Sequence, residues 1–181
     1  TTVGSEFESY AAIVERHLQR IVAIKPYLLE LNLGGTAIGN AVNASETYRK
    51  EIYKELSTIT HLPLTPLPNL MSGTSSQTDF VAVSQLLVSL YIDLSKIASD
   101  IRLLVSGPNG GLGELTLPAF QKGSSIMPGK VNPVSAEMVN QTYYLLNGYE
   151  VTIEQAAHGA QLELRALGPG RRRHPGRRPR G

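Results

Sequence analysis

The feature that most constrains the fold is an unbroken apolar periodicity in the middle of the chain. Steps of three and four residues alternate along the segment, at Phe80, Val83, Leu87, Leu90, Leu94, Ile97, Ile101 and Leu104. This spacing places all of these side chains along one stripe of an α-helix. A helix over 79–105, capped by Thr78 or Asp79, would be about 40 Å long. Such a helix needs other long helices beside it, so the pattern predicts an α-helical bundle and an oligomer.

Two segments before this helix also have helical patterns. Apolar residues at steps of three and four over 7–31 predict a long first helix, in which Pro26 would introduce a kink. Asn43 and Glu46 have the spacing of a capping box, which predicts a second helix over 45–60.

The segment after position 131 has the start signal of a further helix. Asn132 and Pro133 are typical of the N-cap and the first helical position, and the apolar pattern continues to about Gly159. No segment alternates apolar and polar residues over more than four positions. The predicted fold class is therefore all-α.

Composition excludes several classes of protein. The 181 residues are 41% hydrophobic and 18% charged, which is typical of a globular domain. No uninterrupted apolar run approaches the ~18 residues of a membrane span, so we expect no membrane partner. Cysteine is absent, which excludes disulfides and thiolate chemistry and fits a cytoplasmic protein. The four histidines have no ligand-like spacing, so we expect neither a metal nor a cofactor: His17, His61, His158 and His174.

The positive net charge comes from one end of the chain. Residues 168–181 read GPGRRRHPGRRPRG, with six arginines and no acid. Without them the body has 11 basic and 15 acidic residues, which gives no reason to expect nucleic-acid binding. We therefore expect 1–167 to form the helical domain and 168–181 to be an artefactual or disordered end. The alternative is a basic arm that binds nucleic acid.

Residues 106–133 have no sustained period and many glycines and prolines, which predicts a long loop of the kind that is functional or disordered. The loop ends in Gly123–Pro133, which reads GSSIMPGKVNP. Its glycines expose backbone N–H groups, and its side chains add hydroxyls, a cation and an amide. These groups would suit a carboxylate or phosphate. A solvated linker that ends in a helix cap is the alternative.

GSSIMPGKVNP resembles the GSSxMPxKxNP signature of the fumarase/aspartase superfamily at every fixed position. The segments LELNLGGTAIG and DIRLLVSGPNGGLGEL resemble the same family in the same order, so the resemblance covers roughly 1–167. It implies the central long-helix bundle of that fold, truncated at both ends. It also implies a homotetramer whose active sites are each built from three subunits, and a small dicarboxylate substrate.

The resemblance also implies roles for the residues of the loop. Ser124 would be the base that takes a proton from the carbon beside a substrate carboxylate. Lys130 and Asn132 would hold that carboxylate and stabilise the dianionic aci-carboxylate that forms when the proton leaves. Ser125 and Val131 would line the same pocket. Asn132 is open to the simpler interpretation of a helix cap.

Glu137 matches the acid that pairs with an active-site histidine in fumarase-like members. An acid in the first turn of a helix also compensates the macrodipole, so both interpretations stay open. The family's histidine and threonine of the second active-site region precede the first residue of this chain. None of the four histidines here matches that family histidine.

The loop alone does not separate the branches of the family, but its flanks favour one. EMVNQ at 137–141 and QLEL at 161–164 resemble the EVVNQ and QLQLN of aspartases. The expected reaction is the reversible anti-elimination of ammonia from L-aspartate to give fumarate. Two alternatives remain: hydration of fumarate to L-malate, and an inactive helical oligomerisation fragment.

Overall fold

The computed structural model describes residues 1–107, 109–121, 123, 126–127 and 129–164. Across these residues the chain forms α1 (Val3–Leu29), β1 (Glu30–Leu31), α2 (Glu46–Thr60), β2 (Thr65–Pro66), α3 (Leu70–Ser75), α4 (Thr78–Leu104) and α5 (Val134–His158). The all-α prediction is confirmed, because the extended structure is limited to two strands of two residues each. The described residues divide into two compact units: residues 1–25 with 82–151, and residues 26–81 with 152–164.

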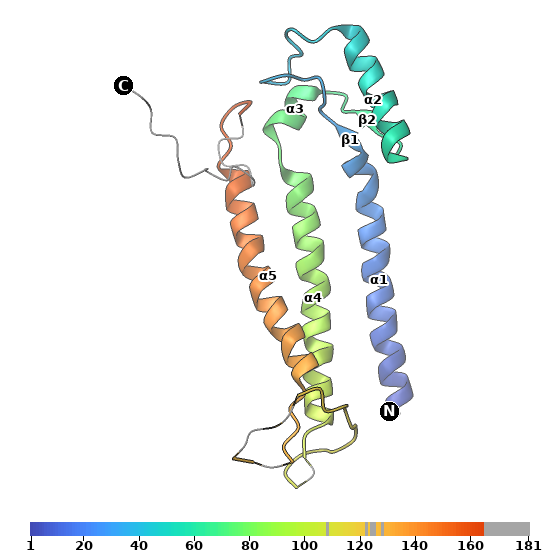
Figure 1. Cartoon of the computed structure of the whole chain (residues 1–181), viewed down its shortest axis with the longest axis vertical. Helices are drawn as coiled ribbons and strands as arrows, with labels where there is room; N and C mark the ends of the chain where they lie inside the picture. Colours follow the sequence, from blue (N-terminus) through green and yellow to red (C-terminus); the bar gives the residue numbers. More distant parts are fainter. Residues whose placement is uncertain (108, 122, 124–125, 128, 165–181) are drawn as a thin grey trace, which may run out of the picture. The chain divides into compact units, whose positions relative to one another are not determined.

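In the first unit α1, α4 and α5 run alongside one another (Figure 1). On the α1 side of α4, His17 Nε2 and Asp93 Oδ2 share a hydrogen bond of 2.6 Å, and His17 is only 2% exposed. On the α5 side of α4, the buried Asn140 amide donates to the Ser95 carbonyl at 2.8 Å. Polar contacts on two sides of α4 thus fix its position between the other two helices.

The chain buries little of its apolar surface. Within the described part, the apolar residues that are buried are Tyr53, Ala98 and Ala136. On α4 and α5 many large apolar side chains are at least half exposed, among them Ile92, Leu103, Met138, Tyr144 and Tyr149. The predicted long helix is confirmed, but this chain alone does not cover it.

By length and composition alone, α4 could cross a membrane, and it is the one such helix in the described part of the chain. The chain has no uninterrupted apolar run of ~18 residues, but α4 as a whole is long and apolar enough despite its scattered polar residues. Its Asp93, Ser95 and Ser99 hydrogen-bond to α1 and α5. A helix apolar nearly all round is equally typical of the interior of a large soluble protein.

Helices α2 and α4 each start one residue away from the predicted position, and other residues cap them. Helix α2 is capped by Ser45, whose hydroxyl accepts from the Tyr48 N–H at 3.1 Å. The capping box predicted for Asn43 is wrong, because that residue turns the chain at φ +64° and stands too far from the first turn.

The caps predicted for α4 are also wrong. Thr78 and Asp79 lie inside its first turn, and Ser76 accepts from the Thr78 N–H at 3.3 Å instead. Helix α3, which Asn69 caps, separates this start from the preceding loop. Six residues are too few to give a periodic signal, so the sequence pattern did not indicate α3.

The long helices at the two ends agree closely with expectation. Helix α1 runs continuously through Pro26 and ends at Leu29, where β1 takes up the last two residues of the predicted range. Helix α5 begins at Val134, one residue later than predicted, and the Pro133 carbonyl accepts its first helical hydrogen bond, from the Glu137 N–H at 3.0 Å.

The second unit contains a parallel pairing of β1 with β2, in which Glu30 lies opposite Thr65. Tyr53 of α2 supports this pairing, because its hydroxyl lies 2.7 Å from the Leu31 carbonyl oxygen and 3.0 Å from that of Leu33. Burial raises the pKa of the Tyr53 hydroxyl, which keeps it a donor to these carbonyls.

Candidate active site

The 106–133 loop contains no helix or strand among its described residues, as predicted. Its first half folds back on the end of α4. The N–H groups of Glu114 and Leu115 donate to the Leu104 carbonyl at 2.8 and 3.2 Å, and the Gly113 N–H donates to the Ser106 carbonyl at 2.7 Å. Carbonyls at a helix C-terminus lack helical partners. The loop supplies partners here and is thereby anchored to α4.

The second half of the loop makes one very close backbone approach. A Cβ atom added at Gly123 would lie 2.0 Å from the Lys130 carbonyl oxygen and 2.9 Å from its carbon. A residue with a side chain cannot occupy this position without moving the backbone. The backbone at Gly123 therefore lies directly against the backbone of Lys130.

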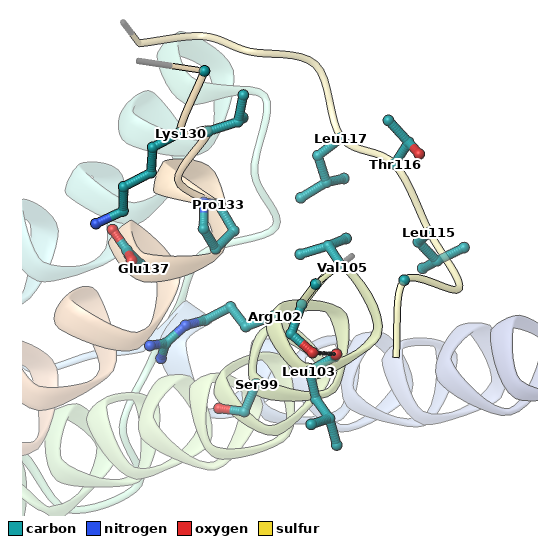
Figure 2. Close-up of a pocket in the computed structure, with 15 residues that line it drawn as sticks. Ser99, Arg102, Leu103, Val105, Leu115, Thr116, Leu117, Lys130, Pro133 and Glu137 are labelled. Carbon is teal, nitrogen blue, oxygen red and sulfur yellow. Dashed lines mark hydrogen bonds between the residues drawn. The ribbon is translucent and has the colours of Figure 1, made fainter. Parts of the chain in front are cut away.

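A cavity of about 870 Å³ lies where α4, the loop and α5 meet. Its polar side chains come from all three elements: Ser99, Arg102, Ser106, Thr116, Lys130 and Glu137. Figure 2 shows Lys130 and Glu137 directed to the same side of the cavity, with Arg102 reaching toward that side from α4. Two cations, one acid and several hydroxyls around one space make a site suited to an anion with hydrogen-bonding groups.

The structure brings together part of the predicted site. Lys130, Val131 and Glu137 all line the cavity. Asn132 lies between them in the chain, is half-buried, and accepts from the Val134 N–H through its carbonyl at 2.9 Å. Ser124 and Ser125 lie outside the described residues. The chemical roles expected of all these residues remain predictions.

Sequence reasoning did not single out Arg102 and Ser99. Arg102 Nη1 donates to the Asn140 side-chain oxygen at 3.1 Å, and Ser99 accepts from the same amide at 3.2 Å. Arg102 lies within DIRLLVSGPNGGLGEL, one of the segments that resemble the family. An arginine in the last turn of a helix is also what the macrodipole favours, so its position alone did not indicate a site.

A second polar cluster lies on the α1 side of α4. The Tyr10 hydroxyl donates to Asp100 Oδ2 at 2.7 Å, and Lys96 donates to the same oxygen. The hydrogen bond to Asp100 raises the pKa of Tyr10 to about 12. Partial burial alone would raise the pKa of Asp100, but hydrogen bonds from Lys96 and Tyr10 hold it below its ordinary value. The cluster ties α1 to α4.

Comparison with protein families gives a match to the model described as "Lyase" over residues 1–145. Aspartate ammonia-lyase of Helicobacter pylori is 44% identical over 168 residues, which are 93% of this chain and 36% of the relative. Aspartate ammonia-lyase of Bacillus subtilis is also 44% identical, over 92% of this chain and 35% of the relative. The chain thus spans little more than a third of the length of these relatives.

Solved structures agree with this comparison. A fumarate lyase:delta crystallin from Brucella melitensis bound to cobalt has a TM-score of 0.88 and 46% identity, covering 92% of this chain and 36% of its own. A class II fumarase from Schistosoma mansoni has a TM-score of 0.87 and 31% identity, covering 90% of this chain and 37% of its own.

Proposed function

We propose that this chain, which belongs to the fumarase/aspartase superfamily of lyases, acts in the reversible elimination of ammonia from L-aspartate to give fumarate. The observation that carries the proposal is its 40–45% identity to aspartate ammonia-lyases over more than nine-tenths of the chain. Identity to the class II fumarase is lower, at 31%. The chain would contribute the loop and the helices of one part of the active site.

The proposed chemistry begins with proton abstraction by Ser124. Its alkoxide takes a proton from the carbon beside one carboxylate of aspartate, and the electron pair moves into that carboxylate to give the aci-carboxylate. The electron pair then returns from the aci-carboxylate to form the carbon–carbon double bond of fumarate. The carbon–nitrogen bond breaks at the same time, and its electron pair leaves with ammonia. Lys130 and Asn132 would stabilise the developing dianion, where electrostatic stabilisation is worth most. The cavity position of Lys130 and its contact with Gly123 support this assignment.

Three further residues would complete the contribution of this chain. Ser125 and Val131 would line the substrate pocket, and Val131 does border the cavity. Glu137 would act as an acid partner to a group from another subunit, because it lies in the cavity wall and is only half-buried. No cofactor enters this mechanism.

The uncovered helices support a shared site in a homotetramer. A chain of this size ordinarily buries much of its apolar surface, whereas here the long helices leave large side chains such as Tyr144 and Leu145 more than half exposed. Packing against the same helices of other subunits would cover them and make α4 an interior helix of a cytoplasmic protein. Light scattering after gel filtration tests this directly, and a monomer at micromolar concentration would contradict it.

A hybrid enzyme tests the activity. Residues 1–164 replace the matching segment of the Bacillus subtilis aspartate ammonia-lyase, and fumarate formed from L-aspartate is followed by its absorbance. The same segment placed in the Schistosoma mansoni class II fumarase is the matched comparison. We expect the first hybrid to form fumarate from L-aspartate and the second hybrid to form much less.

The other outcomes separate the alternatives. If the second hybrid converts fumarate to malate and the first hybrid forms no fumarate from L-aspartate, the result would favour the hydratase. Two assembled hybrids without either activity would favour the inactive oligomerisation fragment.

A further inference from the structure

Two asparagines of this chain are directly followed by glycine. Asn109 precedes Gly110 in the loop, and Asn147 precedes Gly148 in α5. This pair of residues is chemically labile, because glycine has no side chain to shield its backbone nitrogen from the neighbouring asparagine amide. All four residues are exposed. The two pairs therefore have the same sequence and are both open to water, but they differ in backbone geometry.

The turn that contains Asn109 is anchored at its base and open at its tip. The Ser106 carbonyl accepts from the Gly113 N–H at 2.7 Å, and the Ser106 hydroxyl accepts from the Leu112 N–H at 3.2 Å. At Gly110, in contrast, nothing lies within 4 Å of an added Cβ. Within the described part of the chain, no residue hydrogen-bonds to the Asn109 side chain or to the Gly110 N–H. No such contact holds the Asn109 side chain away from the Gly110 nitrogen.

Helix α5 holds the second pair in a different way. Asn147 and Gly148 lie well inside the helix, which runs from Val134 to His158. In an α-helix the backbone dihedrals are fixed, and each N–H points along the axis to the carbonyl four residues earlier. This geometry keeps the Gly148 nitrogen away from the Asn147 side chain, so a reaction between them requires α5 to open.

We propose that Asn109 is a site of spontaneous deamidation. The Gly110 nitrogen loses its proton to water or hydroxide and attacks Asn109 Cγ. A carbon–nitrogen bond forms, and the side-chain nitrogen takes a proton from water and leaves as ammonia. Water then opens the resulting cyclic imide at either carbonyl, to give aspartate or isoaspartate. One water is consumed for each ammonia released, and nothing is oxidised or reduced.

The modification changes the surroundings of the cavity. Both products carry a negative charge in place of a neutral amide, and isoaspartate also routes the backbone through the side-chain carbon. Gly107 and Gly113 of the same turn line the cavity. A deamidated chain would thus differ in charge and backbone path beside the candidate active site.

Peptide mapping of the full 181-residue chain tests the proposal. The chain is incubated in neutral buffer, with and without urea, and digested with trypsin at intervals. One peptide, 103–122, contains Asn109 as its only asparagine, and fragmentation of the peptide 131–165 distinguishes Asn147 from its other asparagines. Mass spectrometry follows the conversion of amide to acid, and an isoaspartate methyltransferase detects isoaspartate.

Each rate in the folded chain is divided by the rate at the same position in urea. We expect this ratio to be near one at Asn109 and about tenfold lower or more at Asn147, which reacts only in the fraction of molecules whose helix is open. Gly110→Ala should slow Asn109 about tenfold in the folded chain and in urea, because its methyl group crowds the attacking nitrogen. Gly148→Ala is the matched control and should leave the Asn109 rate unchanged.

Three results would overturn the inference. Equal ratios at the two asparagines would show that backbone geometry does not select Asn109. A ratio far below one at Asn109 would show that the fold protects it. A Gly110→Ala chain that deamidates at the parent's rate would show that the Gly110 nitrogen is not the attacking group. Enzyme activity is not measured in this test, so its outcome is independent of the proposed function.

Discussion

The helical frame (1–25, 82–104 and 134–151) and the 106–133 loop belong to the same compact unit but are built on different principles. In the frame, polar pairs such as His17 with Asp93 connect neighbouring helices. In the loop, the chain is held by backbone hydrogen bonds to the end of α4 and by the close approach at Gly123. The comparison indicates that stability and chemistry depend on separate sets of residues, so a change in one should leave the other almost untouched.

Ser124→Ala should have the largest effect, and it should be confined to turnover. Loss of a general base typically costs about 10²–10⁴-fold in rate. We expect such a fall in kcat for the aspartase hybrid, with no change in the midpoint of urea unfolding. Wild-type activity would show that Ser124 is not the base. A lowered midpoint would show that the loop contributes to stability as well as to chemistry.

His17→Ala should have the opposite effect. The substitution leaves a cavity and removes the hydrogen bond to Asp93, which together should lower the free energy of unfolding by roughly 2–4 kcal/mol. Urea unfolding of the 181-residue chain at fixed protein concentration measures this. Arg16→Ala, on an adjacent exposed position of α1, should stay within about 0.5 kcal/mol.

Activity in the hybrid completes the His17 test. At a temperature where the His17→Ala hybrid is folded, its kcat should match that of the parent. A large fall in kcat without unfolding would show that the frame takes part in the chemistry.

Gly123→Ala tests the closest approach in the loop. The added methyl group would meet the Lys130 carbonyl at 2.0 Å, so the backbone of one of the two must move. We expect kcat of the hybrid to fall about tenfold or more, since small displacements of catalytic groups cost that much. Gly110→Ala is the matched control in the same loop, because nothing lies within 4 Å of its added Cβ. Equal activity of the two variants would contradict a positioning role for Gly123.

The frame was more predictable from sequence than the site. The α4 pattern from Phe80 to Leu104 repeats over seven turns, so regular geometry alone determines the helix. Caps such as Ser45 depend on single residues and on the path of the preceding loop, and they were misplaced. The cavity position of Arg102 depends on a contact with Asn140, 38 residues later. No local pattern encodes such a contact. Lys130, which the loop's own residues indicated, and Glu137, which the resemblance indicated, both line the cavity.

The smallest effect is expected at the Tyr10–Asp100 contact, at the edge of the frame. Tyr10→Phe should lower the free energy of unfolding by about 1 kcal/mol at neutral pH, the usual contribution of one hydrogen bond. The pKa of Asp100 lies below its ordinary value, so its contribution is present above that value and is lost as pH falls through the folded pKa.

At alkaline pH the hydrogen bond is lost as pH rises, because the group that titrates there is Tyr10 and its pKa is raised. The pKa of Tyr10 is raised from 10.0 to about 12, so its contribution is present below pH 10 and is lost as pH rises through 12. The difference between the parent and Tyr10→Phe should therefore be largest between about pH 5 and 9 and should shrink on both sides. Tyr149→Phe, at an exposed position of α5, should show a smaller difference that does not vary in this way. A Tyr10→Phe difference that stays constant from pH 3 to 12 would show that the hydroxyl contributes through something other than its hydrogen bond to the Asp100 carboxylate.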